Sequence, residues 1–136
     1  MKGNDKRQDG DFAPMQRLPD AEFAVMRAVW ESPEPVTAAV VMKALEGEKS
    51  WKTQTVITLL TRLTERGFLR TEKAGRERGY YPLIDREQYL AAETDSFLRQ
   101  YHNSSLRSLV SALYQGKALP DKDVEELLDW VKEHRD

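Results

Sequence analysis

The spacing of apolar residues predicts three amphipathic helices in the first half of the chain. The first is expected from about Asp20 to Ser32, after the favourable helix start Leu18-Pro19-Asp20. The second is expected to run to Leu45 with Thr37 as its N-cap. The third is expected from about Lys52 to Arg66, and Gly67 is well placed to cap it.

The third predicted helix has two unlike faces. An apolar stripe with the i, i+3, i+4, i+7 spacing of a buried face is formed by Val56, Leu59, Leu60 and Leu63. Polar side chains gather on the opposite side of the helical wheel. We call this side the reading face, and it consists of Gln54, Thr55, Thr58, Thr61 and Arg62. A polar face backed by a core face is typical of a helix that enters the major groove of DNA.

A β-hairpin is expected directly after this helix. Phe68 to Lys73 and Tyr80 to Ile84 are predicted as its strands, and Ala74 to Gly79 as the turn between them. Arg76 and Arg78 lie in that turn, where an arginine can reach backbone phosphate or the minor groove. The predicted helices form a helix-turn-helix, and a β-hairpin directly after them indicates a winged helix.

The second half of the chain is predicted to be helical. One helix is expected from about Arg86 to His102, a second ends at Gly116, and a third follows Leu119-Pro120-Asp121. Short helices with this much apolar surface would leave an exposed patch on a monomer, so we expect a second copy to cover it. The residues expected in this dimer contact are Phe97, Leu98, Leu106, Leu109, Val110, Leu113, Val124, Leu127, Leu128 and Val131.

The elements together predict a mainly α fold with a small β-hairpin wing. Residues 1–17 are expected to form a flexible N-terminal tail, because they hold few large apolar side chains. Residues 18–85 are expected to form a winged helix-turn-helix domain that binds DNA, and residues 86–136 a C-terminal helical dimerisation domain.

The net charge of −2 conceals a basic segment in the middle of the chain. From Ser50 to Tyr80, which we call the basic segment, seven Lys and Arg residues stand against three acids. From Asp85 onward, seven basic residues stand against eleven acidic ones. The basic segment therefore indicates a polyanion partner, which we expect to be double-stranded DNA.

The expected DNA contacts combine the reading face with nearby residues of the helix start and the wing. They are Lys52, Thr53, Gln54, Thr55, Thr58, Thr61, Arg62, Arg76 and Arg78. Gln54 is expected to read a base and Arg62 to meet phosphate. An alternative that the sequence leaves open is a winged-helix module that binds a protein partner without contacting DNA.

Catalytic and metal-binding patterns are not found in the sequence. The chain has no cysteine, and its two histidines, His102 and His134, enter no Ser-His-acid or metal-ligand spacing. We therefore expect neither an enzyme nor a cofactor or metal. No apolar run approaches the roughly 20 residues that span a bilayer, and residues 1–16 lack the apolar segment of a signal peptide. We expect a cytoplasmic protein.

From about Leu18 to the C-terminus, the chain resembles the BlaI/MecI family of bacterial repressors, which control penicillinase and methicillin-resistance genes. The resemblance rests on Asp20-Ala21-Glu22-Phe23-Ala24-Val25-Met26 with Trp30, Trp51 with the stretch from Thr55 to Leu63, Arg66-Gly67, Gly75-Arg76, Tyr81-Pro82 and Ser96-Phe97-Leu98. It implies a homodimer that binds a palindromic operator. In the best-known members, a membrane sensor leads to cleavage within the dimerisation helices.

The chain departs from the family pattern at two places. Lys52-Thr53-Gln54 stands where well-known members tend to have Ser-Pro-Lys, so its operator is expected to differ. The implied cleavage position falls near Ala112 and Leu113, which lack the Asn-Phe pair associated with the cut. Copper-responsive relatives of this family use a C-terminal cysteine cluster, and this chain has no cysteine.

Overall fold

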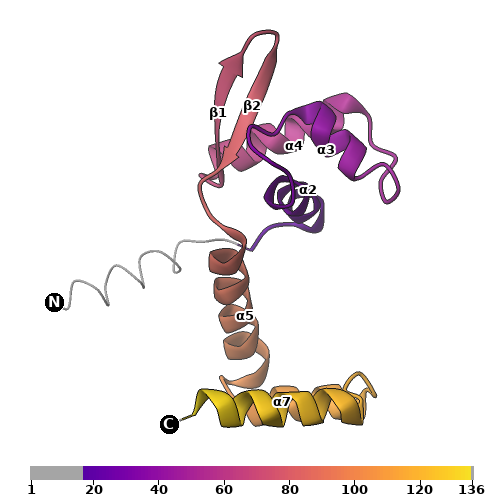
Figure 1. The fold of residues 1–136 in the computed structure, drawn as a ribbon, viewed down its shortest axis with the longest axis vertical. Helices are drawn as coiled ribbons and strands as arrows, with labels where there is room; N and C mark the ends of the chain where they lie inside the picture. Colours follow the sequence, from indigo (N-terminus) through magenta and orange to yellow (C-terminus); the bar gives the residue numbers. More distant parts are fainter. Residues whose placement is uncertain (1–16, 136) are drawn as a thin grey trace, which may run out of the picture. The chain divides into compact units, whose positions relative to one another are not determined.

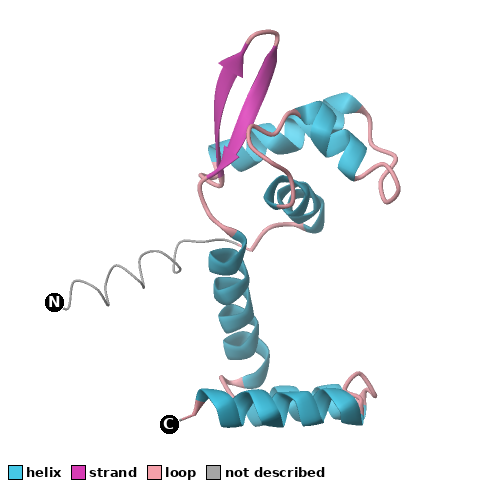
Figure 2. Cartoon of the chain, in the orientation of Figure 1, coloured by secondary structure: helices cyan, strands magenta, loops and turns pink. Residues whose placement is uncertain are grey.

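The computed structural model describes residues 17–135, so the predicted tail lies outside the described residues except for Arg17. The elements in chain order are α2 (Asp20–Trp30), α3 (Ala38–Ala44), α4 (Thr53–Glu65), β1 (Leu69–Ala74), β2 (Glu77–Pro82), α5 (Arg86–His102), α6 (Leu106–Gln115) and α7 (Asp121–His134). Figures 1 and 2 show these helices with the single antiparallel hairpin, which confirms the predicted fold class. The chain divides after Ala92 into two compact units.

The first unit contains every buried hydrophobic residue of the described chain, from Leu18 to Tyr89. The largest fully buried side chains include Met26 on α2, Leu60 on α4 and Leu69 on β1. Burial of each such side chain is worth roughly 1.5–3 kcal/mol. Helices α2, α3 and α4 thus pack around one core, and the hairpin extends from it (Figure 1).

Helix α4 buries the predicted stripe, and the predicted glycine follows its C-terminal end. Gly67 has a φ of 85°, which glycine adopts without strain, and the Phe68 amide donates to the Leu63 carbonyl at 2.9 Å. The same end is tied to α2, because Arg66 Nε lies 2.9 Å from Oε1 of the buried Glu22 side chain. The direction of α4 is therefore fixed by both packing and an ion pair.

The hairpin differs from the prediction in its second strand and its turn. β2 begins at Glu77 rather than Tyr80, and the turn consists of Gly75 and Arg76 alone, with Ala74 paired to Glu77. A two-residue turn whose first residue has a positive φ, here 67° at Gly75, matches the twist of the strands. The longer predicted turn is therefore wrong.

Gly79, which was expected in the turn, lies inside β2. A Cβ at this position would lie 2.8 Å from the Pro35 Cβ, so glycine allows the chain before α3 to approach the strand. This approach lets Val36 pair with Tyr80, with N–O distances of 3.1 and 2.8 Å. The wing is thereby joined to the chain entering α3.

The first turns of α5 belong to the first unit. Tyr89 is 3% exposed, and its ring centroid lies 5.7 to 5.9 Å from those of Phe23, Trp30 and Phe68. The Leu18 amide donates to the Tyr89 hydroxyl at 2.9 Å. The division between the units therefore falls within α5, further along the chain than the expected domain boundary.

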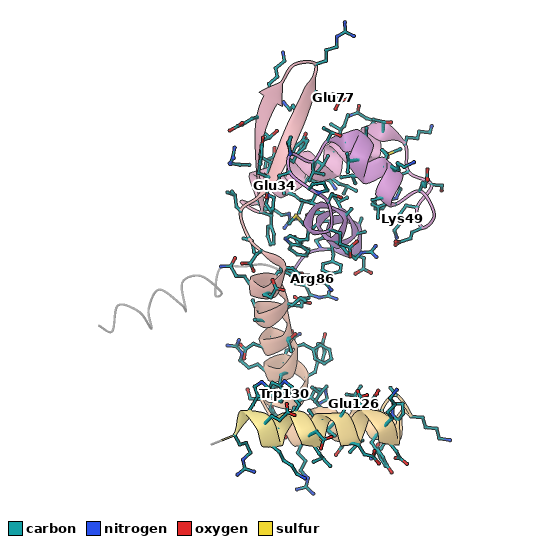
Figure 3. The ribbon with its side chains drawn as sticks, in the orientation of Figure 1. Glu34, Lys49, Glu77, Arg86, Glu126 and Trp130 are labelled. Carbon is teal, nitrogen blue, oxygen red and sulfur yellow. The ribbon has the colours of Figure 1, made fainter. Side chains whose placement is uncertain are left out.

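The second unit holds the rest of α5 together with α6 and α7. Neither α6 nor α7 contains a buried residue in the described chain. Leu106 is 63% exposed, Leu128 55% and Trp130, labelled in Figure 3, 55%. Both helices therefore present apolar side chains that residues 17–135 do not cover.

Candidate nucleic-acid interface

The reading face of α4 lies on the surface, opposite the buried stripe. Gln54, Thr55, Thr61 and Arg62 are exposed, and Thr58 is half-buried. A helix of 13 residues is roughly 20 Å long, and the major groove is wide enough to admit it. The structure thus brings all five predicted reading-face residues onto one accessible surface.

The side chains of the reading face differ in what they offer. The Gln54 amide both donates and accepts, so it can bond adenine in a bidentate way. Thr61 donates its hydroxyl to the Ile57 carbonyl at 2.9 Å, which leaves its methyl group and a lone pair for a partner. Lys52 occupies the N-cap position and Thr53 begins the helix, and both are exposed.

The cations of the basic segment fall into two groups. Arg66 pairs with Glu22, while Arg70 pairs with Glu72 at 2.5 Å and stacks over Tyr81 with its guanidinium 4.0 Å from the ring centroid. The others form no ion pair within residues 17–135, and they are Lys52, Arg62, Lys73, Arg76 and Arg78. This second group includes every cation that the sequence assigned to DNA.

The wing carries one cation that the sequence prediction missed. Arg76 lies in the turn as predicted, but Arg78 lies on β2, directly opposite Lys73 on β1. Like charges at opposed positions of a hairpin repel and destabilise it, whereas a phosphate strand would bridge them. Recognising the two-residue turn after Ala74 would have placed Lys73 beside Arg78 from the sequence.

An exposed ion pair joins α2 to the segment that precedes α4. Arg27 Nη2 on α2 donates to Glu48 Oε1 at 2.7 Å. This hydrogen bond raises the pKa of Arg27 and lowers the pKa of Glu48, so both groups stay charged near neutral pH.

The predicted dimer residues lie on the three helices assigned to them. Phe97 and Leu98 belong to α5, and Ala112 of the implied cleavage position is exposed on α6. The exposed members are Phe97, Leu106, Leu113, Leu127 and Leu128. The half-buried members are Leu98, Leu109, Val110, Val124 and Val131.

Residues 17–135 contain no cluster of three or more His, Asp or Glu side chains arranged to hold a metal ion. No helix in this part of the chain is long and apolar enough to span a bilayer.

The fold and the site define a winged-helix protein with an accessible recognition helix and a basic wing. The family model described as penicillinase repressor matches residues 18–133. The chain belongs to this family, and the resemblance to BlaI/MecI proteins is confirmed.

Two relatives found by sequence agree with this assignment. The chain is 32% identical over 124 residues to the penicillinase repressor of Bacillus licheniformis, covering 89% of this chain and 96% of the relative. It is 26% identical to the methicillin resistance regulatory protein MecI of Staphylococcus aureus strain N315, covering 81% and 89%. Among solved structures, monomeric BlaI of B. licheniformis in complex with the blaP half-operator is 34% identical with a TM-score of 0.46, covering 54% and 89%.

Proposed function

We propose that this protein is a sequence-specific transcriptional repressor that inserts α4 into the major groove of its operator. The observation that carries the proposal is the exposed reading face, set opposite a buried stripe and bordered by cations without intramolecular ion pairs. The relatives named as a penicillinase repressor and a methicillin resistance regulator support this function.

The side chains divide between base reading and phosphate contact. Gln54 is the proposed base reader, since it lies at the start of α4 and its amide can bond adenine in a bidentate way. Arg62, in the last turn of α4, and Lys52, at its N-cap, are proposed to contact the two flanking phosphate strands. Arg76 at the wing tip is proposed to contact backbone or minor groove.

The apolar faces of α6 and α7 support a homodimer as the acting form. Two copies related by a twofold axis would present two recognition helices, so the proposed operator is a palindrome. Repression of this kind has no catalytic step, and its place of action is the bacterial cytoplasm.

Regulation by a membrane sensor and proteolysis is suggested by the resemblance alone. A cut near Ala112 or Leu113 would separate α7 from the rest of the chain. It would thereby remove a large part of the exposed apolar surface from which the dimer is proposed to form.

The test is an anisotropy titration of the full chain against DNA from upstream of its own gene. Each lost base or phosphate contact costs on the order of 1–3 kcal/mol, so Arg62→Ala is expected to weaken operator binding by that amount and to lower the salt dependence. Gln54→Ala is expected to relax the sequence preference. The matched control is Arg99→Ala on α5, because Arg99 is exposed and is not one of the proposed DNA contacts.

The same titration distinguishes the alternative function. Binding without site preference, or an operator affinity that Arg62→Ala leaves unchanged, would contradict a DNA-reading role. A protein partner whose binding tolerates both Arg62→Ala and Arg76→Ala would then identify a protein-binding winged helix.

A further inference from the structure

A groove lies beside the reading face, and of the residues that line it only Thr53, Arg76 and Arg78 belong to the expected DNA contacts. It has a volume of about 770 Å³ and lies between α3, the start of α4 and the wing. Its walls are mainly apolar, and the apolar lining residues are Ala38, Ala39, Met42, Leu45, Trp51, Val56, Ile57 and Tyr80. A hollow of this size and lining resembles the pockets that take small organic molecules.

The edge of the groove is basic. Its charged residues are the four cations Lys43, Lys49, Arg76 and Arg78 and the two acids Glu46 and Glu77. None of these six forms an ion pair within the described part of the chain. Two of these residues are labelled in Figure 3, Lys49 in the turn after α3 and Glu77 on the wing. The Lys49 Nζ lies 5.4 Å from the centroid of the Trp51 ring, on the wall of the groove.

The lining selects among the possible occupants. A DNA phosphate strand needs polar donors along its whole path, whereas this groove offers apolar contact from Met42, Trp51 and Ile57. A neutral apolar molecule would leave the surplus of cations unused. We propose that the groove binds an amphipathic organic anion, with a flat aromatic or aliphatic body on these walls and a carboxylate at Arg78.

The position of the groove couples such a ligand to DNA. Arg76 and Arg78 line the groove and also belong to the proposed DNA contacts. Thr53 and Ile57 line it from α4, beside the reading face. A bound carboxylate would therefore compete with phosphate for the same guanidinium groups. This coupling rests on the proposed function, but binding of the anion does not.

The first measurement is calorimetric titration of the full chain with 2-naphthoate in the absence of DNA. We expect one saturable site per chain and a change in tryptophan fluorescence, because Trp51 lines the groove. The neutral 2-naphthamide has the same ring system, and loss of one charge-assisted contact should weaken its binding roughly tenfold. Equal affinity of the two compounds, or no saturable site, would overturn the proposal.

Variants locate the site. Ala39→Trp fills the groove from an exposed position and is expected to abolish binding of both compounds, while Ala44→Trp on the same helix, outside the groove, is the matched control. Arg78→Gln is expected to bring the affinity for naphthoate down to that for naphthamide. Naphthoate binding that survives Ala39→Trp would place the ligand elsewhere and refute the assignment.

The second measurement adds naphthoate to the protein–operator complex. We expect the apparent DNA affinity to fall as the groove fills, and Arg78→Gln to reduce this effect. If naphthoate binds but DNA affinity does not change, the coupling is refuted and the site stands. If no operator is bound at all, the proposed repressor function fails, and the calorimetric result is unaffected.

Discussion

The two units of this chain use the same kinds of apolar residue in opposite ways. In the first unit, Val25, Leu60 and Leu63 are fully buried between α2, α4 and their neighbours. In the second unit, Leu127 is 43% exposed and Trp130 55%. Both units contain amphipathic helices. They differ in how many elements are available to cover the apolar faces of those helices.

Three helices and a hairpin can surround a core, whereas two short helices after α5 cannot. The most extensive backbone contacts between elements of residues 17–135 lie in the first unit. The first unit is therefore expected to be stable by itself. The second requires another surface, which the proposed homodimer would supply.

The largest expected effect concerns the second unit. Leu127→Asp places a charge on the apolar face of α7, and an uncompensated charge buried at a dimer contact costs roughly 3–5 kcal/mol. We expect sedimentation to show monomers at concentrations where the unchanged protein is dimeric, and operator affinity to fall with it. Leu83→Asp, at a leucine that is 55% exposed in the first unit, is the control that should leave the dimer intact. An unchanged sedimentation coefficient for Leu127→Asp would remove α7 from the contact.

A second pair of substitutions compares the two units with the same chemistry. Leu60→Ala in the first core should cost about 2–5 kcal/mol, because it leaves a cavity. Leu128→Ala should matter only where the dimer forms, since Leu128 is 55% exposed in one chain. Urea unfolding at several protein concentrations separates them: only the Leu128→Ala effect should depend on concentration. One transition that both changes shift equally would mean that the units share a single core.

The sequence predicted helices and faces well, because both follow from local periodicity. The stripe from Val56 to Leu63, the cap at Gly67 and the full span of α5 are confirmed. The turn of the hairpin was harder to predict, because a glycine can permit either a tight turn or the close approach of another segment. Gly75 permits the turn, but Gly79 permits the approach of Pro35 from a distant part of the chain. Only the fold reveals that second constraint.

The candidate interface was predictable for a similar reason. The reading face depends on the phase of one helix, which the sequence determines. By contrast, the separation of paired from unpaired cations depends on tertiary contacts such as Arg66 with Glu22. The groove beside α4 likewise joins Ala38 to Arg78, and their proximity cannot be read from spacing.

A smaller effect is expected at the turn between α6 and α7. Lys117 has a φ of 61°, a left-handed conformation that costs a residue with a Cβ about 1 kcal/mol. Lys117→Gly should therefore stabilise the second unit by up to about 1 kcal/mol. Glu126→Gly, at an exposed position in the interior of α7, should instead destabilise it by a similar amount. Thermal unfolding followed by circular dichroism measures both, and a destabilised Lys117→Gly protein would contradict the left-handed turn.

The smallest effect tests how little the first unit relies on surface charge. Hydrogen bonding to Arg27 lowers the pKa of Glu48 below its ordinary 4.5. A lowered pKa in the folded state stabilises the protein above pH 4.5, and this contribution is lost as the pH falls through the folded value.

Arg27→Gln should return the pKa of Glu48 towards 4.5, as followed by carboxyl NMR. Lys49→Gln should move it less, because Lys49 acts on Glu48 only through space. Equal shifts in the two variants would mean that general charge, and not the 2.7 Å hydrogen bond, sets this pKa. Because Glu48 is exposed, neither variant should shift the unfolding of the first unit as Leu60→Ala does.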